Sequence, residues 1–243
     1  MGRLVALHAG AAVVGGICLP GEAAPEGFAV FDDIEALAAA CSVVVDFTHA
    51  SVVGRHAAAV MAAGAGWVLG TTGLSADGQA AVGAAAARVA VVQAANFSPG
   101  VNLVVALAAR LGAALPADAY DAEIVEMHHR QKVDAPSGTA LAIGAAVARG
   151  RGVALADVRA AAREGHTGAR RAGDIGFAAL RGGQVVGEHT LLFAAGDEHI
   201  SITHRAFDRA SFARGAVRAA LWLQDRKPGL YGMMDVLGMD GSL

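Results

Sequence analysis

The chain of 243 residues has a formal net charge of −3, and 55% of its residues are hydrophobic, with a mean hydropathy of +0.47. About a quarter of the residues are alanine, and a charge, a histidine or a glycine interrupts every apolar stretch that is long enough to span a bilayer. These values predict a protein of one large or two small domains, with no membrane segment and no nucleic-acid partner. Cys18 and Cys41 are expected to be reduced thiols, and 1–7 shows no signal peptide, so we expect a cytoplasmic protein.

In the first half of the chain, short β-branched runs alternate with alanine-rich stretches of helical length. Strands are predicted at 12–18, 43–47, 66–69 and 89–94. Helices are predicted at 32–40, 51–63 and 75–87, with Asp32, Ser51 and Ser75 as N-caps. Because parallel strands need crossover helices, this alternation favours an α/β fold with a Rossmann-like, doubly wound parallel sheet.

The pattern changes after 98. A helix at 101–115, a strand at 120–128 and a helix at 137–149 are followed by a polar loop at 163–172. Strands at 175–181, 184–194 and 198–205 come next, the first two joined by a hairpin turn at Gly182-Gly183, and a helix is predicted at 212–225. We expect a dinucleotide-binding domain at 1–98 with 209–243. A second, α+β domain with a mostly antiparallel sheet, at 99–208, would bind the substrate and form the oligomer.

The densest group of polar and ionisable residues lies between Glu123 and Thr139, in the order strand, loop, helix. A helix that begins at Ser137 would present backbone N–H groups and hydroxyl groups to a carboxylate or a phosphate. His128 and Lys132, just before this helix, can supply a proton and positive charge to the same anion. We therefore predict a site for an anionic small molecule, the alternative being a solvated basic loop.

Lys132 is one of only two lysines among 19 lysine and arginine residues. An ammonium group can release a proton, whereas a guanidinium group does not, so a lysine here suits an acid or a compact anion contact. We expect no metal, because His128 and His129 would point to opposite faces of a strand and no third ligand follows at ligand spacing. Ser137 lacks the Gly-x-Ser-x-Gly elbow of an acyl-transfer nucleophile.

Two loops that follow predicted strands contain residues typical of nucleotide contacts. They are Gly70-Thr-Thr-Gly73 and Ala94-Ala-Asn-Phe-Ser98. Doubly wound sheets bind nucleotides at the carboxyl ends of parallel strands. Each loop alone could be only a turn, but together with the basic loop of the second domain they predict a cofactor that faces a substrate.

These motifs resemble the dihydrodipicolinate reductase family, whose members are also called 4-hydroxy-tetrahydrodipicolinate reductases. The most specific block is His-His-x-x-Lys-x-Asp-Ala-Pro-Ser-Gly-Thr at 128–139. Further matches follow in family order: Val-Asp-Phe-Thr at 45–48, Gly-Thr-Thr-Gly at 70–73, Ala-Asn-Phe-Ser at 95–98, Arg-Glu-Gly-His-Thr-Gly at 163–168, Ile-Gly-Phe at 175–177, Val-Gly-Glu-His-Thr at 186–190, Ile-Thr-His at 202–204 and Gly-Ala-Val-Arg-Ala-Ala-Leu-Trp at 215–222.

The resemblance implies an enzyme that uses NADPH or NADH to reduce 4-hydroxy-tetrahydrodipicolinate to tetrahydrodipicolinate, in the diaminopimelate route to lysine. It implies that His128 donates or accepts a proton and that Lys132 is a second proton donor. It also implies a substrate site that consists of His129, Ser137, Gly138 and Thr139. The cofactor groove would consist of Gly70, Thr71, Thr72, Ala94, Ala95, Asn96 and Phe97. The family is typically a homotetramer assembled through the sheet of the second domain.

Two departures from the family pattern lie near the start of the chain. Members open with a strand and a Gly-x-x-Gly-Arg-Met-Gly loop, whereas Met1-Gly-Arg3 matches only the end of that motif, so we expect a natural protein that starts upstream of Met1. The segment 17–20 has no acidic residue or arginine to read the adenosine ribose, which leaves NADPH and NADH both open. The alternatives are another two-domain NAD(P)-dependent dehydrogenase and a non-catalytic remnant that binds a dicarboxylate.

Overall fold

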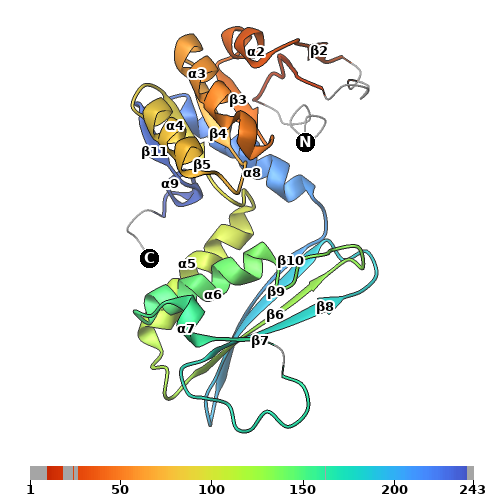
Figure 1. Cartoon of the computed structure of the whole chain (residues 1–243), viewed down its shortest axis with the longest axis vertical. Helices are drawn as coiled ribbons and strands as arrows, with labels where there is room; N and C mark the ends of the chain where they lie inside the picture. Colours follow the sequence, from red (N-terminus) through yellow and green to blue (C-terminus); the bar gives the residue numbers. More distant parts are fainter. Residues whose placement is uncertain (1–9, 19–23, 25–26, 162, 240–243) are drawn as a thin grey trace. The chain divides into compact units, whose positions relative to one another are not determined.

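The computed structural model describes residues 10–18, 24, 27–161 and 163–239, and it divides the chain into two compact units (Figure 1). Unit 1 contains the described residues up to Pro99 and from Ala210 onward, and unit 2 contains Gly100–Arg209. Each unit has its own sheet and its own hydrophobic core, as a separately packed domain requires. Within the described ranges, no helix is long and apolar enough to cross a membrane.

Unit 1 is built on a parallel sheet of four strands in the order β11-β5-β4-β3. The strands are β3 (Val43–Asp46), β4 (Gly66–Leu69), β5 (Ala90–Gln93) and β11 (Gly229–Tyr231). Both faces are covered by helices, since Trp67 shares a buried cluster with one set of helices and its neighbour Val68 shares a cluster with the other. The two sets are α2 (Ile34–Ala40), α3 (Val53–Ala63) and α4 (Ala76–Ala86), and α8 (Ala210–Leu223) and α9 (Met233–Leu237). The predicted Rossmann-like parallel sheet is therefore confirmed.

The strand predicted over 12–18 is wrong in extent, because only β1 (Gly15–Gly16) is extended and paired. It pairs in parallel with β2 (Ala29–Val30), in a separate two-stranded sheet. A Cβ atom at Gly15 would lie 2.4 Å from the carbonyl oxygen of Ala29, so this close pairing requires glycine. Glycine, in turn, gives a strand no side chain to pack, which explains why the segment does not extend the main sheet. Among the described strands, β3 is consequently an edge of that sheet.

The helix starts in unit 1 agree only in part with the predicted caps. Ser75 caps α4 as predicted. The cap of α2 is Asp33 rather than Asp32, because either of two adjacent aspartates can supply a capping carboxylate and the sequence does not distinguish them. Ser51 is not a cap either, since it lies inside a 3₁₀ turn, η1 (Ala50–Val52), that precedes α3.

Unit 2 contains a mixed sheet of five strands in the order β10-β9-β6-β8-β7. The strands are β6 (Asp121–His128), β7 (Arg159–Ala161), β8 (Ile175–Arg181), β9 (Gly187–Ala194) and β10 (His199–Ala206). Strands β10, β9 and β6 pair antiparallel, whereas β8 pairs in parallel with both β6 and β7. The predicted hairpin between β8 and β9 is wrong, because β6 lies between them. The turn after β8 instead crosses the end of β6, where Gly182 N donates to His128 O at 3.0 Å.

One face of this sheet packs against helices. These are α5 (Pro99–Ala114), α6 (Gly138–Gly150) and α7 (Leu155–Val158), and they share a buried cluster with side chains of β6, β8 and β9 (Figure 1). Val125 on β6 and Leu180 on β8 are exposed apolar side chains of the same sheet. Unit 2 therefore has an apolar core beneath the helices and leaves some apolar sheet residues in contact with solvent.

Candidate active site

The predicted substrate residues lie where β6 ends and α6 begins, within unit 2. His128 is the last residue of β6, and Ser137 is the N-cap of α6. Gly138 and Thr139 are the first two residues of that helix, and Lys132 lies in the loop between strand and helix. The N-terminus of a helix carries partial positive charge and backbone donors, so this junction is suited to an anion.

A buried glutamate, Glu126, joins strand and helix. It is 1% exposed and accepts four hydrogen bonds. The donors are His128 Nδ1 at 2.6 Å, Ser137 N at 3.1 Å and the two terminal nitrogens of Arg181, each at 2.8 Å. Burial alone would raise the pKa of Glu126, but the hydrogen bonds from Arg181, His128 and the Ser137 backbone outweigh burial and lower it. The carboxyl group is therefore ionised at neutral pH.

The carboxylate of Glu126 determines how His128 is presented. An ionised carboxylate can only accept, so Nδ1 of His128 carries the hydrogen and Nε2 is left to exchange a proton with a ligand. The His128 ring packs edge-on against His189, with centroids 5.1 Å apart. A Cβ atom at Gly187 would lie 3.0 Å from Nε2 of His128, so glycine at this position leaves the room that the ring needs.

Ser137 is held by a second buried histidine. Its hydroxyl lies 2.8 Å from Nε2 of His189, which is 4% exposed, and it accepts from Ala140 N at 3.1 Å. Burial, followed by repulsion from His128, lowers the pKa of His189 to about 4, so this ring is neutral at pH 7. Nδ1 of His189 has no partner in the described part of the chain. An orphaned acceptor costs less than an orphaned donor, which favours the hydrogen on Nε2 and leaves the Ser137 hydroxyl hydrogen free to meet a carboxylate.

Lys132 is already paired inside the loop. Its Nζ donates to both carboxylate oxygens of Asp134, at 2.8 and 2.9 Å, and this hydrogen bond lowers the pKa of Asp134. The backbone oxygen of Asp134 accepts from Arg181 at 2.6 Å, which ties the loop to the residue that also binds Glu126. The neighbouring His129 lies 3.2 Å from Gln131 through Nδ1. Lys132 therefore stands in the same hydrogen-bonded assembly as His128, through Asp134 and Arg181, and its backbone N–H donates to His129 O at 3.1 Å.

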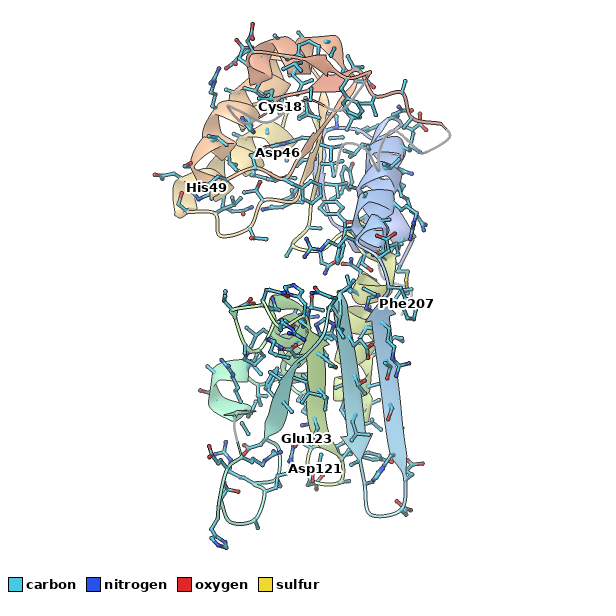
Figure 2. The ribbon with its side chains drawn as sticks, turned by 90° about the vertical axis from the view of Figure 1, so that its right-hand side faces the viewer. Cys18, Asp46, His49, Asp121, Glu123 and Phe207 are labelled. Atoms are coloured by element: carbon cyan, nitrogen blue, oxygen red, sulfur yellow. The ribbon has the colours of Figure 1, made fainter. Side chains whose placement is uncertain are left out.

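In unit 1, a buried aspartate organises the loop after β3. Asp46 is 2% exposed and accepts four hydrogen bonds. The donors are Thr48 N at 3.0 Å, the Thr48 hydroxyl at 2.6 Å, His56 Nδ1 at 2.7 Å and Trp67 Nε1 at 3.3 Å. Figure 2 labels Asp46 and, farther along the loop, His49. Burial would raise the pKa of Asp46, but the hydrogen bonds from His56 and Thr48 outweigh it and lower the pKa.

The predicted cofactor residues lie in loops at the carboxyl ends of β4 and β5. The hydroxyl of Thr71 donates to Thr48 O at 3.0 Å, so its hydrogen holds two loops together and is not available to a ligand. A Cβ atom at Gly70 would lie 2.2 Å from the ring of Phe47, which in turn packs edge-on against Phe97, with centroids 5.3 Å apart. A side chain at position 70 would therefore displace the Phe47 ring, whatever else the loop binds. Thr72, Ala94, Ala95 and Asn96 lie in the same two loops.

Unit 1 also contains a pocket of about 750 Å³ beside the edge strand β3. Its walls include Gly15, Val43, Val45, Thr48 and Val217. The volume falls in the range of small-molecule sites, and a mostly apolar wall with a few polar groups suits a planar ring and a ribose. The pocket runs along β3 from Val43 at its amino end to the Thr48 loop at its carboxyl end.

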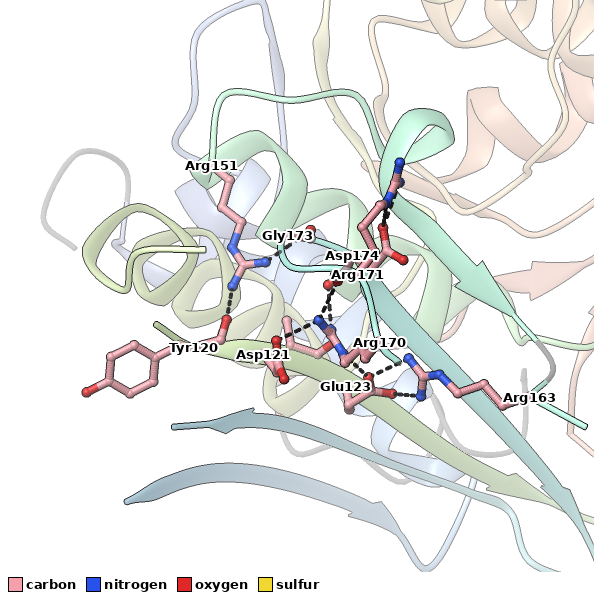
Figure 3. A network of polar contacts seen from close by, with 10 residues as sticks. Tyr120, Asp121, Glu123, Arg151, Arg163, Arg170, Arg171, Gly173 and Asp174 are labelled. Carbon is pink, nitrogen blue, oxygen red and sulfur yellow. Dashed lines mark hydrogen bonds and ion pairs between the residues drawn. The ribbon is translucent and has the colours of Figure 1, made fainter. Parts of the chain in front are cut away.

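A different ionic network lies in unit 2, at the start of β6. Glu123 accepts from Arg163, at 2.9 and 2.8 Å, and from Arg170 at 2.9 Å, and Arg170 also donates to Asp121 at 2.6 Å (Figure 3). Arg170 makes further bonds to backbone oxygens of β6 and of the loop before β8. This network fastens the polar loop to the sheet, at the opposite end of β6 from His128.

Sequence reasoning missed three residues of the assembly in unit 2: Glu126, Arg181 and His189. Glu126 stands two residues before His128, on the same side of the strand, and this spacing is the one signal that could have identified it. Arg181 and His189 come from β8 and β9, which lie on either side of β6. Only the strand order brings them to Glu126, and no local motif in the sequence contains that order.

The sequence comparisons are consistent with this geometry. The family described as dihydrodipicolinate reductase, N-terminus, matches residues 9–97, and its C-terminal counterpart matches residues 100–237. The 4-hydroxy-tetrahydrodipicolinate reductase of Granulibacter bethesdensis is 61% identical over 243 residues, covering 98% of this chain and 93% of that protein. The enzyme of the same name from Acidiphilium cryptum is 59% identical over 238 residues, covering 98% and 94%.

The fold comparison agrees with the sequence. A solved structure described as dipicolinate-bound dihydrodipicolinate reductase from Paenisporosarcina sp. TG-14 superposes with a TM-score of 0.78 at 23% identity, and the match covers 96% of this chain and 92% of that one. Both halves of the chain match the same family, in order, and relatives well above half identity cover almost its whole length. This chain belongs to the dihydrodipicolinate reductase family.

Proposed function

We propose that the junction of β6 and α6 binds the dicarboxylate substrate of the family reaction, with His128 and Lys132 as its proton donors. The chain is an NAD(P)H-dependent oxidoreductase, a 4-hydroxy-tetrahydrodipicolinate reductase of lysine biosynthesis. The observation that carries the site assignment is the fixed orientation of His128, whose Nε2 is left as the proton-exchanging atom next to the N-terminus of α6.

The chemistry of the reaction requires a proton as well as a hydride. The reduced nicotinamide supplies the hydride when it is bound. The product has lost the 4-hydroxyl group of the substrate, so the overall step adds a hydride, takes up one proton and releases that hydroxyl as water. His128 Nε2 and Lys132 Nζ are the groups at this junction that can deliver a proton. Asp134 accepts two of the three ammonium hydrogens of Lys132, which leaves the third for a ligand.

The two carboxylates of the substrate need donors that are already oriented. Backbone N–H groups of Gly138 and Thr139 at the first turn of α6 would donate to one carboxylate, together with the hydroxyl of Ser137. The charge of Lys132 and the imidazole of His129 would hold the other. The donors of Ser137, Gly138 and Thr139 are fixed by the helix and by the bond to His189. They therefore bind the first carboxylate without a large ordering cost.

Unit 1 would hold the cofactor through the loops after β3, β4 and β5. The candidates for direct contact are Gly70, Thr71, Thr72, Ala94, Ala95, Asn96 and Phe97. The support is their common position at the carboxyl ends of parallel strands and the apolar pocket beside β3. Thr71 would contribute only as an acceptor or through its backbone, because its hydroxyl hydrogen is used by Thr48.

We further propose a cytoplasmic homotetramer. The free thiols of Cys18 and Cys41 support a reducing compartment. Exposed apolar residues on the sheet of unit 2, among them Val125 and Leu180, support assembly through that sheet, because a second copy would remove them from water. Light scattering of the purified protein tests this assembly.

The experiment that tests the function measures oxidation of NAD(P)H with freshly made product of dihydrodipicolinate synthase. We expect turnover by the wild type, a loss of kcat of about 100-fold in Lys132→Ala and a rise in KM of about tenfold in Thr139→Ala. Absence of turnover, with tight calorimetric binding of pyridine-2,6-dicarboxylate and none of NAD(P)H, would instead identify a binding protein. The reverse split between kcat and KM would contradict the roles of Lys132 and Thr139.

A further inference from the structure

We infer that Glu126 is a positioning residue that fixes the ring and the tautomer of His128 for proton transfer, and that Arg181 opposes the effect of its charge. The inference deepens the function proposed above and rests on the assignment of His128 as the proton-exchanging group. The side chain of Glu126 binds His128 and the backbone N–H of Ser137, and the side chain of Arg181 binds Glu126 and the backbone oxygen of Asp134.

The first step of the argument is geometric. Among the described residues, Glu126 Oε2 is the partner of His128 Nδ1, at 2.6 Å, and both groups are buried. With this bond in place the hydrogen stays on Nδ1, and the ring cannot turn over without breaking a charge-assisted hydrogen bond. The edge contact with His189 supports the ring in this orientation, and Gly187 leaves room for it. Glu126 therefore decides which nitrogen of His128 faces a ligand.

The second step is electrostatic. The charged and titratable groups that surround the His128 ring are Glu126 on its own strand, Arg181 at the end of β8, His189 on β9 and the pair formed by Lys132 with Asp134 in the following loop. The carboxylate of Glu126 favours the protonated ring, whereas the guanidinium that grips the same carboxylate disfavours it. Removal of one partner should thus shift the titration of His128 in one direction, and removal of the other in the opposite direction.

A purely structural role makes a different prediction. Glu126 also binds the backbone of Ser137 and the side chain of Arg181, so it could serve only to fasten the loop before α6. Glu123 fastens a loop in this way at the other end of the same strand, where it binds Arg163 and Arg170 and is hydrogen-bonded to no histidine within the described ranges. Glu123→Gln is therefore a matched control, because the same substitution on β6 breaks a glutamate-diarginine network without touching His128.

The test compares pH profiles of kcat for the wild type and for Glu126→Gln, Arg181→Gln and Glu123→Gln. If His128 acts as an acid, kcat falls as pH rises through its titration. We expect this limb to move by about one pH unit to lower pH in Glu126→Gln and to higher pH in Arg181→Gln. We also expect kcat at its optimum to fall at least about tenfold in Glu126→Gln, because the amide no longer dictates the tautomer. Glu123→Gln should keep the wild-type limb.

A second readout does not depend on turnover. Diethyl pyrocarbonate acylates imidazole only in its unprotonated form, and peptide mass spectrometry follows the reaction at His128 as a function of pH in the unliganded protein. The same opposite displacements are expected for Glu126→Gln and Arg181→Gln. If the wild type proves inactive but the displacements appear, the proposed function fails and the positioning role stands. If both variants move together with Glu123→Gln, or none moves, Glu126 only fastens the loop. Should Glu126→Gln not fold, Arg181→Gln decides alone.

Discussion

Each unit of this protein contains a buried carboxylate paired with a histidine, and the two pairs are nearly identical in geometry. Asp46 lies 2.7 Å from His56 Nδ1 in unit 1, and Glu126 lies 2.6 Å from His128 Nδ1 in unit 2. Both histidines are 8% exposed, and both carboxyl groups have a lowered pKa despite burial. The pairs differ in what else the carboxylate binds.

Asp46 accepts its other hydrogen bonds from the uncharged groups of Thr48 and Trp67, so the pair fixes the shape of a loop. Glu126 accepts from the cation of Arg181, which neutralises much of the charge of the carboxylate. The electrostatic effect of Glu126 on His128 therefore depends on Arg181. With the roles proposed above, a carboxylate–histidine pair is not by itself a sign of catalysis. The remaining partners of the carboxylate decide whether the pair shapes the backbone or prepares a ring for proton transfer.

The largest expected difference between the pairs is kinetic. His128→Gln should lower kcat by about 100-fold or more, because the variant loses a proton donor at the reacting end of the site. His56→Gln should change the KM for NAD(P)H and leave kcat much less affected, because His56 acts on the Thr48 loop through Asp46. Steady-state assays with each variant at several NAD(P)H concentrations provide the measurement. Equal losses of kcat in the two variants would remove the distinction between the pairs.

The second difference is in how the stability of the two units depends on pH. In unit 2 the pKa of His189 is lowered by burial to about 4, from an ordinary value of 6.5. The folded state therefore binds this proton less well than the unfolded state does. The free energy of unfolding is therefore unaffected by His189 above pH 6.5, and it decreases by about 3 kcal/mol at most as the pH drops toward 4. The pKa of Asp46 lies below its ordinary 3.8, so the stability that its charge contributes to unit 1 is retained in this window.

Hydrogen exchange resolves the two units. After correction for intrinsic rates, amides of β6 and β9 should lose protection between pH 6.5 and 4, while those of β3 and β4 keep it. His189→Asn should remove most of this slope, although burial also lowers the pKa of His204 on the adjacent strand and leaves a remainder. An unchanged slope in the variant would show that another group titrates.

The sequence was sufficient for the parallel sheet of unit 1, because its strands are short, Val-rich and separated by helices of crossover length. It was misleading around Gly15, where a hydrophobic run looked like a strand but two glycines allow only a short pairing with Ala29. The short elements β7, α7, β11 and α9 were not predicted, because a few residues carry too little periodicity. The hairpin at Gly182 failed since turn residues report a change of direction and not which strand lies alongside.

For the candidate site, the sequence predicted a contiguous set of residues, and the structure places them together at one junction. Residues 128–139 form one strand end, one loop and one helix start, and a local pattern can describe all three. A local pattern could not predict the residues that contact His128 or its carboxylate partner, because Arg181 and His189 come from other strands. Thr71 is the complementary case: the sequence placed it in a ligand loop, and the structure shows its hydroxyl bound to the backbone of Thr48. Chain neighbours indicate where chemistry is, and the fold decides which atoms are free for it.

The smallest expected effect separates the charge of Asp46 from its size. Asp46→Asn should destabilise unit 1 by about 2 kcal/mol, because a neutral amide leaves one of its buried donors unpaired. Since the folded pKa of Asp46 is depressed, the stability from its charge is present above about pH 4 and lost as the pH falls through the folded pKa. The difference between wild type and variant in the free energy of unfolding, measured with urea, should therefore disappear in acid; this difference is called the gap below. Asp33→Asn is the matched control, since asparagine caps α2 as well as aspartate does and the gap should be near zero at every pH. A gap for Asp46→Asn that persists in acid would mean that packing, and not the charge shared with His56, holds this loop.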